Sequence, residues 1–213
     1  TGLTKTAPRQ MERALPLLVP VLALLQGDMK KETKASAVAA LKASTELLEN
    51  DDIKSFLPVL RACLMDPKNL IEVIHDLAST TFVQVLTAPM LAIVVPILLK
   101  GLKERDNSTK RLCGVIINNL VKLVESPDEV KEFIESLIDP IVKAHKTCST
   151  PEARKTLEDI QGKLTSLAAE GEKILASGKS ILSLKLPEIE ATITKAKNAP
   201  ANKETTTYCG LVA

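Results

Sequence analysis

The chain has 213 residues, a length that corresponds to one large domain or two small ones. It contains three Phe, one Tyr and no Trp, which argues against an all-β protein because strands are rich in aromatic and β-branched residues. Its net charge of +2 is too small to predict binding to nucleic acid or to a membrane by itself.

Four prolines lie in similar apolar surroundings along the chain. They are Pro20 in LLVPVL, Pro58 in SFLPVL, Pro96 in IVVPIL and Pro140 in LIDPIV, at spacings of 38, 38 and 44 residues. Repeats of about 40–47 residues with two helices each are typical of HEAT-type solenoids. We therefore predict an all-α fold, a HEAT-repeat α-solenoid of about four helix pairs. A proline inside each first helix would kink it and curve the stack.

The first two predicted repeats span residues 10–50 and 53–87. In the first, leucines recur at helical spacing up to Gln26, and Asp28 is expected to cap a second helix that runs to about Glu49. In the second, the apolar residues of 53–64 share one helical face, Asp66-Pro67 ends that helix, and another helix runs to about Phe82.

The third and fourth predicted repeats span residues 89–126 and 128–170. In the third, the turn after the first helix offers Asp106 as a capping residue. In the fourth, Thr150 followed by Pro151 predicts the start of the last helix. The predicted domains are therefore a repeat array over 1–170 and a second unit.

Residues 171–213 depart from this pattern. Alternating leucines at 182–186 indicate a short extended link, and residues 205–213 resemble the start of a further buried helix. We expect a linker followed by the start of a second helical unit. The chain begins without Met and ends inside an apolar pattern, so we also expect it to be a piece of a longer protein.

Few residues suggest chemistry. The segment GEKILASGKS has six residues between its glycines, whereas a phosphate-binding P-loop has four, so no nucleotide site is predicted. Cys63, Cys113, Cys148 and Cys209 lack metal-site spacing and are expected to be free buried thiols. We predict no catalytic residue, metal or cofactor in this chain, and we interpret the lone His75 as a packed or surface imidazole. The longest apolar run, Leu15–Leu25, is too short for a membrane span.

Basic side chains are the candidate binding groups. A predicted solenoid edge carries one cluster around the turn of the third repeat and another at the second helix of the first repeat. The eight candidates are Lys100, Lys103, Arg105, Lys110, Arg111, Lys30, Lys31 and Lys34. Binding to structured RNA through phosphates requires mainly Lys and Arg, although a solvated helix edge is the commoner explanation of such a cluster.

Several stretches in order resemble the N-terminal HEAT domain of the translation elongation factor 3 family. They include STTFV at 79–83, VVPILLKGLKER at 94–105, VIINN at 115–119, KLVESP at 122–127, PEAR at 151–154 and ETKASAVAALKASTELLEN at 32–50. The resemblance extends over about residues 14–167. It implies that the chain is the later part of the HEAT array plus the start of a four-helix bundle.

The resemblance also implies a function. Members of the family are cytoplasmic ribosomal ATPases whose two ABC domains, downstream in the same chain, use ATP and Mg to help release tRNA from the exit site. Their HEAT domain contacts the ribosome, through rRNA and ribosomal proteins. The chain is therefore expected to bind ribosomes without being an enzyme itself, and no membrane partner is expected. The alternative is a protein-binding HEAT scaffold of the general-control, stalled-ribosome-sensing class or of the transport-adaptor class.

Overall fold

A computed structural model describes residues 2–25 and 29–198, with side chains up to Gly178. All regular structure in these ranges is helical, and no strand is present there. The helices follow in the order α1 (Gly2–Thr6), α2 (Pro8–Arg13), α3 (Leu15–Leu25), α4 (Lys31–Thr45), α5 (Asp51–Lys54), α6 (Leu57–Met65), α7 (Leu70–Ser79), α8 (Ala88–Gly101), α9 (Asn107–Val121), α10 (Pro127–Thr147) and α11 (Pro151–Asn198), with a short 3₁₀ helix at Pro67–Asn69. The chain divides into two units, Thr1–Gly171 and Glu172–Ala213.

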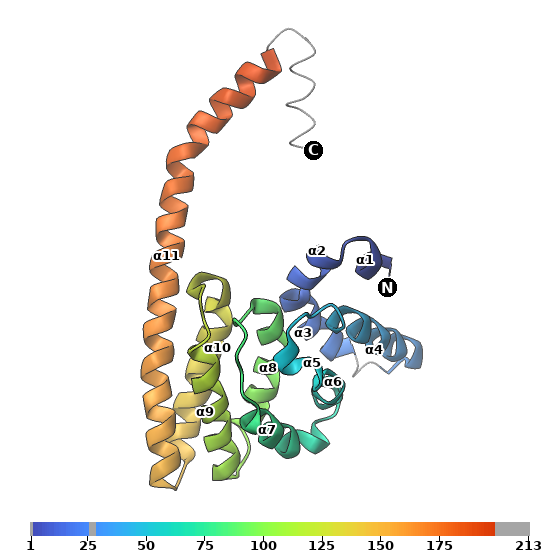
Figure 1. Ribbon diagram of the computed structural model, residues 1–213, viewed down its shortest axis with the longest axis vertical. Helices are drawn as coiled ribbons and strands as arrows, with labels where there is room; N and C mark the ends of the chain where they lie inside the picture. The colour runs from blue at the N-terminus through green and yellow to red at the C-terminus, as the bar shows by residue number, and fades with distance from the viewer. Residues whose placement is uncertain (1, 26–28, 199–213) are drawn as a thin grey trace. The chain divides into compact units, whose positions relative to one another are not determined.

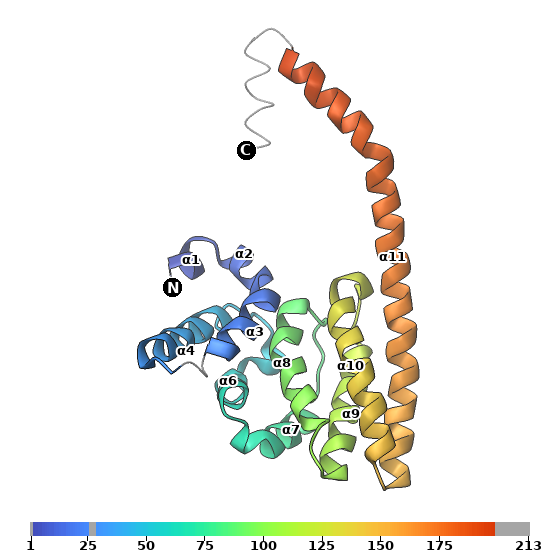
Figure 2. The ribbon, with the colours of Figure 1, turned by 180° about the vertical axis from the view of Figure 1, so that it is seen from behind.

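The first unit is a stack of helix pairs, α3 with α4, α6 with α7, α8 with α9, and α10 with the first part of α11. Within it, α8 contacts α3, α6, α7, α9 and α10, and α7 also contacts α9. Figures 1 and 2 show α8 between α3 on one side and α10 on the other. One continuous apolar core therefore connects neighbouring pairs, as a solenoid requires. The predicted all-α solenoid is confirmed.

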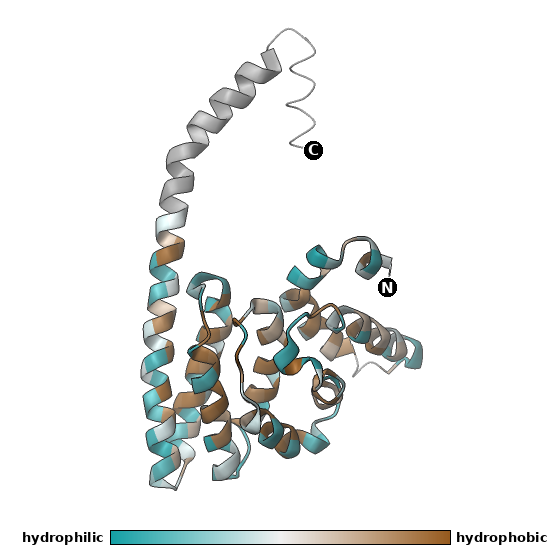
Figure 3. Ribbon diagram, in the orientation of Figure 1, coloured by the Kyte–Doolittle hydropathy of each residue, from teal (hydrophilic) through white to brown (hydrophobic). Residues whose placement is uncertain are grey.

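Helix α8 forms the centre of that core because its sequence is apolar on every side. Nine of its residues are buried, namely Met90, Leu91, Ala92, Ile93, Val94, Val95, Ile97, Leu98 and Gly101. Figure 3 shows the same concentration of apolar residues on α8 and on the neighbouring parts of α9 and α10. A helix that is apolar all round is stable only when other helices cover it.

Three of the four repeated prolines lie in the interior of a helix, whereas Pro58 lies in the first turn of one. Pro20, Pro96 and Pro140 are interior residues of α3, α8 and α10, whereas Pro58 lies in the first turn of α6. The predicted single helix over 53–64 is therefore wrong. A turn at residues 55–56 separates α5 from α6, and the first turn of a helix accepts proline because its N–H groups have no partner in the helix.

The loop between α7 and α8 was also missed by the helical pattern. Helix α7 ends at Ser79, before the expected Phe82, and residues 80–87 cross the surface without regular structure. The Asp52 carboxylate accepts hydrogen bonds from the backbone N–H groups of Val83 and Gln84, both at 2.8 Å. The loop thus takes its backbone partners from a residue 31 positions earlier, which no local sequence pattern predicts.

Other boundaries differ in smaller ways. The expected helix over 10–26 is divided at Ala14 into α2 and α3. The expected extended link at 182–186 is wrong, since α11 is helical from Pro151 to Asn198. The predicted start of that helix at Pro151 is confirmed. The expected cap at Asp28 and the expected helix over 205–213 lie outside the described residues.

Gly171 marks the end of the first unit through a close approach rather than a break. A Cβ atom at this position would lie 2.7 Å from the carbonyl oxygen of Pro127, the first residue of α10. Only a residue without a side chain permits this backbone contact between α11 and the start of α10.

Candidate functional site

The eight basic residues predicted as contacts form two groups in the structure. Five lie at the end of α8, in the turn that follows and at the start of α9; the other three lie at the start of α4. The two groups differ in whether the charged ends of the side chains bind other parts of the protein or are exposed to solvent. That they share one edge of the solenoid stays a prediction.

Lys100 stabilises the fold rather than presenting a charge to solvent. Its Nζ atom donates hydrogen bonds to the backbone carbonyl oxygens of Cys63 at 3.3 Å and Leu64 at 3.0 Å. These carbonyls belong to the last turn of α6, where helix geometry leaves C=O groups without a partner. A lysine there satisfies the acceptors and interacts favourably with the negative end of the helix dipole.

Lys110 is also directed inward. Only 5% of the residue is exposed, and Nζ donates to the hydroxyl oxygen of Thr147 at 2.8 Å. That hydroxyl donates in turn to the carbonyl oxygens of Lys143 and Ala144, both at 3.1 Å. The ammonium of Lys110 therefore lies at the C-terminal end of α10, just as the ammonium of Lys100 lies at the end of α6.

The remaining residues of this group are accessible. Lys103 and Arg105 are exposed in the α8–α9 turn. The side chain of Arg111 is 36% exposed, and it forms an ion pair with Glu152 of α11 at 3.4 Å. Asp106 begins α9 by accepting hydrogen bonds from the backbone N–H and the hydroxyl of Thr109, both at 2.7 Å, and these bonds lower the pKa of its carboxyl. The predicted capping role of Asp106 is confirmed.

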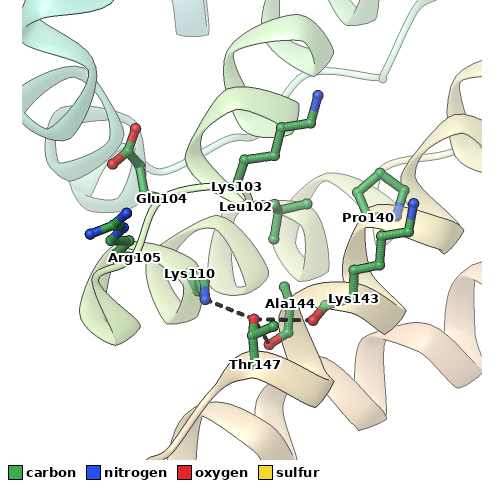
Figure 4. A pocket seen from close by; sticks show the side chains of 9 residues that line it. All are labelled: Leu102, Lys103, Glu104, Arg105, Lys110, Pro140, Lys143, Ala144 and Thr147. Atoms are coloured by element: carbon green, nitrogen blue, oxygen red, sulfur yellow. Dashed lines mark hydrogen bonds between the residues drawn. The ribbon is translucent and has the colours of Figure 1, made fainter.

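A groove of about 440 Å³ lies between the α8–α9 turn and the C-terminal half of α10 (Figure 4). Four cationic side chains and one carboxylate line it, together with apolar residues. The lining residues are Leu102, Lys103, Glu104, Arg105, Lys110, Pro140, Lys143, Ala144 and Thr147. Sequence reasoning missed Lys143, which lies inside α10 and lines the groove because α10 packs against α8.

Lys30, Lys31 and Lys34 are exposed at the start of α4. Lys31 is the first helical residue, and the preceding Lys30 makes no side-chain capping hydrogen bond. Positive charge at a helix N-terminus is disfavoured by the helix dipole. The position of Lys31 is therefore not explained by helix stability.

Cys63, Cys113 and Cys148 are free and buried, as predicted, and burial raises the pKa of the Cys113 thiol to about 12. Cys209 lies outside the described residues. Within 2–25 and 29–198, no three His, Cys, Asp or Glu side chains gather as metal ligands would. None of the helices searched in these ranges is long and apolar enough to cross a membrane.

Paired helices stacked around one core, with basic turns on the surface, define an α-solenoid of the HEAT-repeat class. The chain belongs to the family described as "Elongation factor 3/GNC1 HEAT repeat", whose match covers residues 68–174. It is 41% identical over 155 residues to elongation factor 3 of Candida glabrata and 40% identical over 155 residues to elongation factor 3A of Saccharomyces cerevisiae. Each of these matches covers 73% of this chain and 15% of the relative.

A longer match of lower identity extends the similarity. Elongation factor 3 of Pneumocystis carinii is 36% identical over 186 residues, which cover 87% of this chain and 18% of that protein. The chain thus spans less than a fifth of the length of these relatives, and what it shares with them is their HEAT region.

Proposed function

We propose that the chain is the ribosome-binding HEAT segment of an elongation factor 3-like protein. The observation that carries the proposal is its 41% identity to elongation factor 3 of Candida glabrata over 155 residues, which are 73% of this chain. The same relatives favour this function over a general-control or transport-adaptor scaffold, because they are translation elongation factors by name. In the complete protein, ABC domains elsewhere in the chain would use ATP and Mg to promote release of tRNA from the exit site, in the cytoplasm.

The contacts with the ribosome would be made by the accessible basic side chains. Lys103 and Arg105 are exposed on one turn, and Lys31 and Lys34 are exposed on α4. Each Lys or Arg that neutralises an rRNA phosphate releases a counterion, so binding weakens as salt increases. Lys100 and Lys110 have protein partners, and their role in this function is to hold neighbouring repeats together.

The test is co-sedimentation of the chain with purified fungal ribosomes over a series of salt concentrations. Replacing Lys103 and Arg105 together by Glu should weaken binding, and it should reduce the slope of log affinity against log salt by about one for each phosphate that is no longer neutralised. The matched control replaces Lys5 and Lys155, which are exposed elsewhere, by Glu and changes the net charge equally.

The two outcomes separate clearly. Binding that falls in the first variant and not in the control supports a ribosome-contact surface at the α8–α9 turn. Equal binding by both variants removes Lys103 and Arg105 from the proposal. If the unchanged chain fails to co-sediment at low salt, the ribosome-binding function itself is refuted for this segment.

A further inference from the structure

The groove between the α8–α9 turn and α10 is lined by a largely buried lysine that has no ion-pair partner in the described part of the chain. Lys110 lines this groove and is only 5% exposed. No ion pair joins its ammonium to a carboxylate in the described part of the chain. Buried charges in proteins are usually paired, because removing an ion from water costs several kcal/mol by general estimates.

The partners that Lys110 does have satisfy it only in part. An ammonium has three N–H donors, and one of them is directed to the Thr147 hydroxyl. The C-terminal end of α10 adds a partial negative charge, which stabilises the ammonium without neutralising it. The groove is therefore suited to receive an anionic group beside Lys110.

The side chains that line the groove indicate which kind of ligand would bring the anionic group. Lys103 and Lys143 are exposed on opposite sides of it, one on the α8–α9 turn and the other on α10 (Figure 4). Between them lie the apolar side chains of Leu102, Pro140 and Ala144. Glu104 is the one carboxylate in the lining, against the four cations Lys103, Arg105, Lys110 and Lys143. This cationic excess over apolar side chains complements a segment with alternating carboxylates and aliphatic side chains.

We infer that this groove binds a short acidic peptide segment of a partner protein. One carboxylate of the segment pairs with Lys110, neighbouring carboxylates pair with Lys103 and Lys143, and an aliphatic side chain covers Leu102. An RNA strand fits less well, since no aromatic side chain lines the groove to stack on a base. The polar sugar–phosphate backbone would also make no favourable contact with the apolar side chains of the groove. The inference goes beyond the proposed ribosome contact and does not depend on it.

The test uses fluorescence anisotropy with the labelled hexapeptide Glu-Glu-Leu-Glu-Glu-Leu and the 213-residue chain. Lys110→Met keeps an unbranched side chain that is one atom shorter and removes the charge, and it should weaken binding by about thirtyfold or more. Lys143→Glu, at an exposed position on the rim, should weaken binding by about fivefold. Lys155→Glu, on α11 and outside the groove, should leave the affinity unchanged.

Two further probes decide the class of ligand. The peptide Glu-Glu-Ser-Glu-Glu-Ser should bind more weakly than the leucine peptide if the apolar side chains of the groove contribute. Equal binding of both peptides, or unchanged binding by Lys110→Met and Lys143→Glu, would overturn the inference. A 12-nucleotide RNA that displaces the leucine peptide and loses affinity in the same two variants would also overturn it, because the groove would then be an RNA site.

Discussion

Helices α3 and α8 have nearly the same kind of sequence but very different surroundings. Both are strongly apolar, and both have a proline in the interior, Pro20 and Pro96. Yet α8 buries nine residues, whereas the buried residues of α3 are Leu15 and Val19. On α3, Leu17 and Leu24 are 77% and 79% exposed.

The difference in burial between α3 and α8 comes from the number of neighbouring helices and not from the residues of the two helices. Helix α8 packs against α2, α3, α6, α7, α9 and α10, while α3 packs against α2, α4 and α8. An apolar sequence therefore shows that a helix can be buried. Whether it is buried depends on how many neighbouring helices pack against it. The same leucine should contribute to stability in one helix and hardly at all in the other.

The largest expected difference between the two helices concerns Leu98 of α8 and Leu24 of α3, which are 0% and 79% exposed. Leu98→Ala should lower the free energy of unfolding by about 2–5 kcal/mol, because it removes buried methyl groups and leaves a cavity. Leu24→Ala should change it by less than about 0.5 kcal/mol. Urea unfolding followed by circular dichroism measures both, and similar losses would show that α3 is buried in solution.

A second contrast uses two glycines, Gly101 at the end of α8 and Gly2 in α1. A Cβ atom at Gly101 would lie 2.6 Å from the Cys113 sulfur and closer still to Cδ1 of Ile74, whereas nothing lies within 4 Å of one at Gly2. Gly101→Ala should therefore destabilise the chain by about 1–3 kcal/mol through overpacking, and Gly2→Ala should be nearly neutral. Thermal unfolding distinguishes them, and a neutral Gly101→Ala would mean that α7 and α9 move apart readily.

Helix capping gives a smaller and pH-dependent contrast. Asp106 caps α9 and has a lowered pKa from its hydrogen bonds to Thr109, while α4 has no side-chain cap. Asp106→Ala should cost about 1 kcal/mol at pH 7. Since the folded pKa lies below the unfolded one, the charged part of this stabilisation is complete above the ordinary value of 3.8 and disappears as the pH falls through the folded pKa.

The control for this contrast is Asp106→Asn, which keeps an acceptor oxygen and has no carboxyl to titrate. Its stability relative to the unchanged chain should improve as the pH is lowered from 7 to 3, in parallel with Asp106→Ala. If both differences stay constant over this range in urea unfolding, the Asp106 carboxylate does not contribute through its charge.

The smallest expected change in the free energy of unfolding is an increase rather than a decrease. Lys31 is the first residue of α4, where the helix dipole disfavours a cation. Lys31→Glu should therefore raise the free energy of unfolding by about 0.3–1 kcal/mol and at the same time weaken ribosome co-sedimentation. A variant that is more stable but binds as before would remove α4 from the proposed contact surface.

The sequence predicted the fold class and most helix pairs because apolar periodicity and repeat spacing are local signals. It failed at two boundaries, and a distant residue decides one of them. The α7–α8 loop depends on Asp52, which lies 31 residues before Val83. The break before Pro58 is a local feature, since proline is accepted in the first turn of α6, and the apolar periodicity of 53–64 did not reveal it.

For the candidate surface, the sequence predicted which basic residues cluster in the chain but not which of them are exposed. Lys100, Lys103, Arg105 and Lys110 look alike in sequence, but two of them donate to helix ends in neighbouring repeats and two are exposed. Lys143 joins them only through stacking of α10 against the preceding pair. Which lysines are available to a partner is a property of the stack, since the hydrogen-bond acceptors of Lys100 and Lys110 lie 36 or 37 residues away.

Lys100 and Lys110 have a consequence for how the array unfolds. Lys100 connects the third helix pair to α6 of the second, and Lys110 connects it to α10 of the fourth. In a linear array, the interfaces between neighbours determine whether repeats unfold together or one after another. We therefore expect the third pair, through two lysines at either end of a single turn, to make the repeats on both sides unfold together.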